Sequence, residues 1–143
     1  MSLFSFSGTA PTDLGVNNGQ LKSCPNTPNC VSSQAPADDK EHAIAPFTYA
    51  GSAKDAIQRL KQIIEGMERS TINTVTDDYL YAEFSSKLMG FVDDVEFYAP
   101  PGESIIHTRT AARLGKSDLG VNRRRIEQIR LAFNDMVKRA VAQ

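Results

Sequence analysis

Residues 70–111 read STINTVTDDYLYAEFSSKLMGFVDDVEFYAPPGESIIHTRTA, and this stretch decides the fold. It is rich in Thr, Val, Tyr and Phe, and it breaks at an Asp-Asp pair, at a Lys-Leu-Met-Gly segment and at a Pro-Pro-Gly turn. Such runs, bounded by turn residues, are typical of strands. The pattern predicts strands near 70–76, 79–86, 91–98 and 104–111. Because short connections join successive strands, we expect an antiparallel meander.

Two segments outside the meander repeat apolar residues with the period of an amphipathic helix. One spans about 52–66 and begins at Ser52, and the other spans about 122–141 and begins at Asn122, both of them good N-cap residues. The residues expected to be buried are Ile57, Leu60, Ile64, Ile126, Ile129 and Phe133. The predicted fold class is α+β, a two-layer structure in which both helices cover one face of a meander of four to five strands. The other face then needs water, the N-terminal segment or a partner.

The first 46 residues predict an extended, turn-rich arm, since they contain five prolines and three glycines and almost no periodicity. Residues 47–143 form the α+β part, with a short strand near 47–50, and the two parts make one structural domain. Apolar residues in the arm predict that it is ordered on the sheet from about Leu14 to Val31.

Size and charge restrict the class of protein. The chain has 143 residues with 41% hydrophobic and 23% charged, which is ordinary for one globular domain. Sixteen basic and seventeen acidic residues leave a net charge of -1, which argues against nucleic acid as a partner. No apolar run reaches the roughly 20 residues of a transmembrane segment. The N-terminus does not resemble a secretory signal, so we expect a cytoplasmic protein of undetermined oligomeric state.

The two cysteines, Cys24 and Cys30, lie in CPNTPNC. Their spacing differs from the Cys-x-x-Cys of redox and zinc sites. The loop could close a disulfide, but a reducing compartment favours free thiols. Neither a metal site nor a cofactor is expected, because the cysteines with His42 or His107 would make an irregular ligand set.

Three carboxylates lie in the predicted strand 91–98. Because side chains alternate between the two faces of a strand, Asp94 and Glu96 share the face away from the helices. Asp93 falls on the core side, so the three do not form one cluster.

Placing Ile106 in the core predicts a register in which Phe97 lies opposite Ile106. The cross-strand pairs are then Glu96 with His107, Asp94 with Arg109, and Asp93 with Thr110. These pairs favour surface ion pairs worth roughly 0.2–1 kcal/mol each. The alternative is an acid–base site whose candidate catalytic residues are Glu96, His107 and Asp94.

The segment ARLGKSDLGVNRRR, residues 112–125, leads into the last predicted helix. A helix N-terminus with free amides and nearby arginines can bind an anion, although the glycines and Asp118 can also simply shape and cap a turn. The candidate ligand-binding residues are Arg109, Arg113, Ser117, Asp118, Asn122 and Arg125. The loop lacks the spacing of a phosphate-binding P-loop, and the chain has no Gly-x-Ser-x-Gly or His-Glu-x-x-His motif.

Three blocks, LGVNNGQLKSCPNTPNCVSSQ, YLYAEFSSKLMGFVDDVEF and RTAARLGKSDLGVNRRRIEQIR, together resemble the family called domain of unknown function 1499. The resemblance runs from about Leu14 to Arg130 and implies a small domain found in bacteria and plastid-type settings, with no established substrate or catalytic residue. Its pattern includes Cys24, Cys30, Asp93, Asp94, Glu96, Arg113, Asp118, Asn122 and Arg125. Similar proteins tend to have serines at Thr110 and Ala111, which makes a hydroxyl role there doubtful. Some relatives look exported, which raises the chance of a disulfide.

Three functional hypotheses follow. The one we favour is non-catalytic binding of a small anionic ligand, or of an acidic group of a partner, through the loop between Arg113 and Arg125 and the adjacent helix N-terminus. The second is a small hydrolase or isomerase that uses Glu96 and His107 as an acid–base pair. The third is a structural or assembly factor.

Overall fold

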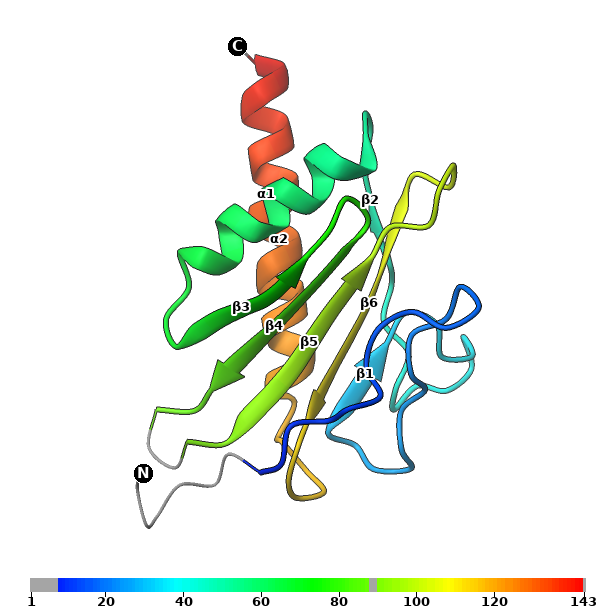
Figure 1. The fold of residues 1–143 in the computed structure, drawn as a ribbon, viewed down its shortest axis with the longest axis vertical. Helices are drawn as coiled ribbons and strands as arrows, with labels where there is room; N and C mark the ends of the chain where they lie inside the picture. Colours follow the sequence, from blue (N-terminus) through cyan, green and yellow to red (C-terminus); the bar gives the residue numbers. More distant parts are fainter. Residues whose placement is uncertain (1–7, 88–89, 143) are drawn as a thin grey trace.

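Six strands and two helices make up the fold (Figure 1). The computed structural model describes residues 8–87 and 90–142, with side chains as far as residue 136. The strands are β1 (Cys30–Ser32), β2 (Phe47–Thr48), β3 (Ser70–Val75), β4 (Tyr79–Ser85), β5 (Val92–Tyr98) and β6 (Ile105–Ala112). The helices are α1 (Ala53–Glu65) and α2 (Val121–Ala142).

The strands form one sheet in the order β1-β6-β5-β4-β3, and β2 also pairs with β6. All pairings are antiparallel, so the predicted meander of β3 to β6 is confirmed. The sheet has six strands where four or five were expected, because β1, inside the predicted arm, adds to the free edge of β6. A strand of three residues is too short to give a periodic signal in the sequence.

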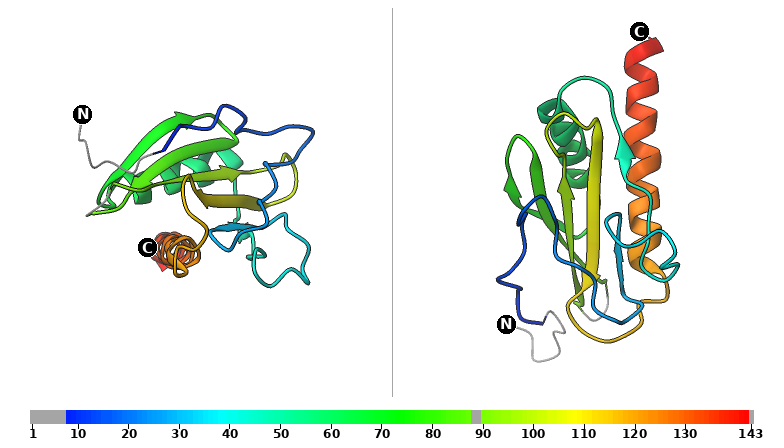
Figure 2. Two further views of the ribbon diagram at one scale, coloured as in Figure 1. Left: turned by 90° about the horizontal axis from the view of Figure 1, so that it is seen from below. Right: turned by 90° about the vertical axis from the view of Figure 1, so that its right-hand side faces the viewer.

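Both helices cover the same face of the sheet, as predicted. Helix α1 packs on β3 and β4, α2 packs on β6 and β1, and the helices contact each other. Figure 2 shows the helices on one side and the start of the arm crossing the opposite side. The arm therefore takes the second face, which the amphipathic helices leave uncovered.

The core lies between the helices and the sheet. All six helix residues predicted to be buried are buried, and they pack against Leu80, Phe84, Val95, Phe97 and Ile106 of the strands. Phe47 of β2 meets the rings of Phe97 and Phe133 edge-on, with ring centres 5.7 and 5.6 Å apart. Edge-to-face pairs of this kind add to the hydrophobic contribution of the core.

The two predicted N-caps have different outcomes. Ser52 caps α1 as expected, and its hydroxyl accepts a hydrogen bond from the N–H of Asp55 at 3.1 Å. The expectation for Asn122 is wrong, because α2 already begins at Val121. Asp118 takes the capping role, since one of its carboxylate oxygens accepts from the Asn122 N–H at 3.0 Å.

The predicted register of β5 and β6 is wrong by two residues. Phe97 lies opposite Thr108, and Glu96 lies opposite Arg109. Ile106 pairs instead with Phe47 of β2. A shift by two residues leaves every side chain on its predicted face, so the apolar alternation cannot distinguish the two registers. The pairing of β2 with the start of β6 lies on the edge that β6 also shares with β1, so it does not compete with β5.

No helix within the described part of the chain is both long enough and apolar enough to cross a membrane.

Candidate functional site

The face of the sheet that points away from the helices carries polar side chains under the arm. Strands β4, β5 and β6 contribute alternate residues to it, and one more follows β6. We call the group the arm-facing cluster: Tyr79, Tyr81, Glu83, Asp94, Glu96, Arg109 and Arg113. Asp94, Glu96 and Arg109 are buried. Buried charges are costly unless they are paired and hydrogen-bonded, so the pairing of each one matters.

Glu96 is completely buried, and one of its two oxygens is fully used. Its Oε2 accepts a hydrogen bond from the Tyr79 hydroxyl at 2.6 Å and another from the Gly15 N–H at 2.8 Å. The second bond ties the arm to the middle of the sheet. The other oxygen, Oε1, has no hydrogen-bond partner among the described residues. Burial raises the pKa of Glu96, although the hydrogen bonds from Tyr79 and Gly15 oppose this.

Arg109 lies opposite Glu96 and is only 4% exposed. Its Nη1 is 4.0 Å from Glu96 Oε1, which is too far for a hydrogen bond. Its Nε has no partner within the described segments. Burial lowers the pKa of Arg109, and the Glu96 carboxylate opposes this. A guanidinium carries five N–H donors, so this buried ion pair has hydrogen-bonding capacity left on both sides.

Asp94 and Arg113 form a complete, buried ion pair. Arg113 donates from Nε to Oδ2 at 2.9 Å and from Nη2 to Oδ1 at 2.8 Å. The Tyr81 hydroxyl also donates to Asp94 Oδ1 at 2.5 Å, and Glu83 lies 3.0 Å from Arg113 Nη2. The hydrogen bonds with Asp94 raise the pKa of Arg113. An arginine of the 112–125 segment therefore reaches a carboxylate of β5.

A second polar group lies on the other side of the sheet, beside the start of α2. Arg125 pairs with Asp93 at 2.8 Å, and burial raises the pKa of Asp93 against the effect of Arg125. The Asn122 side-chain oxygen accepts from the Thr110 hydroxyl and from Arg125 Nη1. The Thr110 hydroxyl therefore has a structural role inside the protein.

The N-terminus of α2 is capped by the side chain of Asp118, which lies just before the helix. Asp118 accepts from the N–H groups of Gly120 and Asn122, at 2.8 and 3.0 Å, and from the Asn122 side-chain amide. Burial alone would raise the pKa of Asp118, but these hydrogen bonds hold it below its usual value. The carboxylate occupies the amides that a bound anion would need.

The expected pair of Glu96 and His107 does not form. His107 lies opposite Tyr98 in the sheet, and its Nδ1 is 3.0 Å from the Ser33 hydroxyl. Burial lowers the pKa of His107. The candidate acid and base are therefore separated by the two-residue shift in register, which removes the geometric basis of the acid–base hypothesis.

A pocket of about 330 Å³ opens between the arm and the sheet. Its charged lining residues are Lys22, Asp94, Arg109 and Arg113. Lys22 comes from the arm and also pairs with Asp13 at 2.8 Å. The remaining wall is mostly apolar, with Pro11, Leu14, Pro25, Ala111 and Ala112. Arg109 thus combines unused donors with a place on a pocket wall.

Residues 20–133 match the family model described as Protein of unknown function (DUF1499). The chain belongs to this family. No curated protein matches it.

In this DUF1499 chain the candidate site residues divide between two places. The arm-facing cluster holds Asp94, Glu96, Arg109 and Arg113, and the start of α2 holds Ser117, Asp118, Asn122 and Arg125. They do not form one site, because the sheet lies between them. Within the described residues, no group of three or more His, Cys, Asp or Glu side chains is arranged to hold a metal ion.

Sequence reasoning placed the arm on the sheet but did not find the contacts that the tyrosines and the arm make in this DUF1499 site. Tyr79 lies opposite Tyr98 but donates its hydrogen bond to Glu96. Tyr81 lies opposite Glu96 but donates to Asp94. Each carboxylate is thus two residues away from the direct cross-strand partner of the tyrosine. Such diagonal contacts are within reach of aromatic side chains, but they need a known register. Gly15 and Lys22 reach the site only through the path of the arm, which carries no periodic signal.

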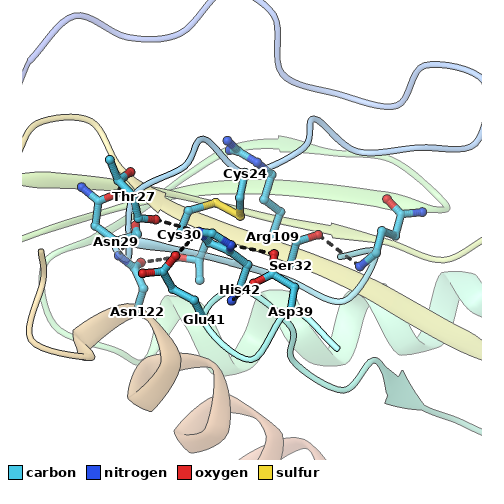
Figure 3. The surroundings of a disulfide bond; sticks show 12 residues. Cys24, Thr27, Asn29, Cys30, Ser32, Asp39, Glu41, His42, Arg109 and Asn122 are labelled. Carbon is cyan, nitrogen blue, oxygen red and sulfur yellow. Dashed lines mark hydrogen bonds and ion pairs between the residues drawn. A yellow bond between two sulfur atoms is a disulfide. The ribbon is translucent and has the colours of Figure 1, made fainter. Parts of the chain in front are cut away.

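The cysteines of the DUF1499 chain form a disulfide, so the expectation of free thiols is wrong. The sulfur atoms of Cys24 and Cys30 are 2.04 Å apart. Figure 3 shows Arg109 beside this bond and His42, Asp39 and Glu41 close to it. The cytoplasmic location stays a prediction.

His42 connects the disulfide loop to the segment that follows β1. Its Nδ1 lies 2.8 Å from the Asp39 carboxylate, and its Nε2 lies 2.8 Å from the Thr27 carbonyl oxygen. Both partners are acceptors, so both ring nitrogens must carry a proton and the imidazole is charged. The hydrogen bond with Asp39 raises the pKa of His42, although burial opposes this.

We expect the stabilising effect of His42 to depend on pH. Its pKa in the folded protein lies above the unfolded value of about 6.5. The contribution is therefore complete below about pH 6.5 and is lost as the pH rises through the folded pKa. The measurement is urea unfolding of the wild type and of His42→Gln from pH 5.5 to 9. The difference in free energy of unfolding should shrink as the pH rises.

His107 does not confuse this measurement, because both proteins keep it and its contribution cancels in the difference. Its pKa is lowered, so its own effect would have the opposite sign. A difference that stays constant over the whole range would contradict the charged state assigned to His42.

Proposed function

We propose that this domain binds a small anionic ligand, or an acidic group of a partner, in the pocket between the arm and the sheet. Arg109 is the principal contact, and Arg113 and Lys22, each already paired with a carboxylate, also line the pocket. The role is binding, without a chemical step. It retains the anion-binding hypothesis but moves the site from the α2 N-terminus to the arm-facing cluster.

The observation that carries this proposal is the guanidinium of Arg109. It is buried, it lines the pocket, and its Nε has no hydrogen-bond partner among the described residues. A buried donor without a partner costs roughly 1–3 kcal/mol, and more when it is charged. An oxyanion in the pocket would recover this free energy, because the planar fork of a guanidinium matches two oxygens of a carboxylate or phosphate.

The other arginines are less suited to be the main contact. Arg113 already has Asp94 and Glu83 as partners, and Arg125 has Asp93 on the other side of the sheet. The amides at the start of α2 are taken by Asp118. A ligand at any of these places would have to displace an internal carboxylate.

The test is the change in thermal midpoint on adding sodium acetate, malonate or inorganic phosphate at constant ionic strength. A ligand at 100 times its Kd stabilises the folded state by about 2.7 kcal/mol, so at least one anion should raise the midpoint by several degrees. Arg109→Gln should abolish that rise, because it removes the charged guanidinium and leaves a shorter, neutral polar side chain.

Lys54→Gln is the matched control. It removes one positive charge from an exposed position of α1, which packs on the opposite face of the sheet, and it should respond to anions as the wild type does. An Arg109→Gln variant that still responds fully, or a wild type that responds to no anion, would overturn the proposal.

A further inference from the structure

The walls of the pocket differ in chemistry from one side to the other. Three of the four charged side chains come from β5, β6 and the residue after β6. The arm contributes the apolar Pro11, Leu14 and Pro25, together with Thr9, Lys22, Ser23 and Cys24. Ala111 and Ala112 extend the apolar wall along β6. A ligand that fills this space needs a polar head at Arg109 and an apolar body under the arm.

The charges around the pocket disfavour a ligand with more than one negative charge. Lys22 is paired with Asp13 at 2.8 Å, and Arg113 has two carboxylates as neighbours, Asp94 at 2.8 Å and Glu83 at 3.0 Å. Arg109 has Glu96 at 4.0 Å, which is too far for a hydrogen bond, so among the described arginines of the pocket it is the one with donors to spare. A second negative charge on the ligand would face the carboxylate of Asp94 in the pocket wall, so a dianion fits poorly.

The volume gives the scale of the part of a ligand that the pocket can enclose. The pocket of about 330 Å³ corresponds to about eleven water molecules at their volume in the liquid. It can therefore enclose about ten non-hydrogen atoms, which is at the small end of ligand sites in proteins.

From these three features we infer that the ligand is a monocarboxylate with a short apolar body, bound with its carboxylate on Arg109 and its body against Leu14 and the prolines of the arm. This inference rests on the proposed anion-binding function and names the ligand class. It predicts that the arm determines which apolar bodies are accepted, while Arg109 of the sheet binds the carboxylate.

The experiment is calorimetric titration of the full chain with acetate, butyrate, hexanoate and octanoate, and with malonate and inorganic phosphate, at constant ionic strength. From acetate to hexanoate the affinity should rise by up to about fourfold for each added methylene group. The gain should end near octanoate, which has about ten non-hydrogen atoms and fills the available volume. Malonate and phosphate should bind more weakly than hexanoate.

Two variants of the arm test whether the apolar body of the ligand is bound separately from its carboxylate. Leu14→Ala should flatten the dependence on chain length, because it should weaken the binding of hexanoate far more than the binding of acetate. Val16→Ala, a matched truncation of an exposed arm residue outside the pocket lining, should keep the wild-type dependence. Loss of acetate binding in Leu14→Ala would count against the inference, because Leu14 would then support the head and not the body.

The possible failures are distinguishable. If phosphate or malonate binds at least as tightly as hexanoate, or if chain length has no effect, the monocarboxylate inference is wrong. The proposed function survives that result provided that Arg109→Gln abolishes the binding observed. If none of the six probes binds, both are wrong.

Discussion

Replacing Arg113 with Ala is expected to lower the free energy of unfolding by about 3–5 kcal/mol, because it breaks a buried ion pair and leaves Asp94 without its partner. The side chains of Arg113 and Asp94 are only 6% and 3% exposed. Two hydrogen bonds join them, and Arg113 also meets Glu83. Urea unfolding of the wild type and the variant measures the loss. Asp94→Asn in the Arg113→Ala background should restore part of the stability, since it removes the unpaired charge.

Arg69→Ala is the comparison for this result. Arg69 also forms a salt bridge, with Glu68 at 3.0 Å, but the two side chains are 42% and 84% exposed. Exposed pairs contribute roughly 0–1 kcal/mol. If Arg113→Ala costs no more than Arg69→Ala, the arm-facing cluster does not stabilise the fold and the buried pair has no structural role.

Truncating Phe133 to Ala is expected to cost about 3–5 kcal/mol, since it leaves a large cavity in the core. Phe133 is completely buried, meets Phe47 edge-on and lies under the guanidinium of Arg59, whose central carbon is 4.8 Å from the ring centre. The cavity would open where α1, α2 and β2 meet. Equilibrium unfolding in urea gives the size of the loss.

Leu131→Ala tests whether this effect belongs to the core and not to the helix. Leu131 is in the same helix but 73% exposed, so its truncation should change stability by less than about 0.5 kcal/mol. Similar losses for the two variants would contradict the packing of α2 on the sheet.

How much of this protein was predictable depends on which physical signal each feature carries. The helices and the meander follow from local periodicity, because an element that buries one face repeats apolar residues at its own period. Ile57, Leu60, Ile126 and Phe133 were assigned to the core on that basis, and all four are buried. The division of β5 into a core face and a polar face followed from the same alternation.

The candidate site was only partly predictable, because its contacts join parts of the chain that no local pattern relates. Asp94 and Glu96 were placed on the correct face, but their partners depend on the register, and a shift by two residues preserves that face. The shift exchanges His107 for Arg109 opposite Glu96. In place of the hypothetical acid–base pair, the structure has a buried ion pair of Glu96 and Arg109 with unused hydrogen-bonding groups.

What the sequence by itself determined is therefore the set of elements and the face on which each side chain lies, since both depend on neighbours a few residues apart. Only the tertiary structure decided the register of β5 and β6, the disulfide and the path of the arm over the polar face. Each of these depends on contacts across long separations, such as the bond between Gly15 and Glu96. The pocket at Arg109 exists because the arm closes over the sheet. The apolar residues of the arm predicted that it lies on the sheet, but no local pattern of residues indicated which polar side chains it covers.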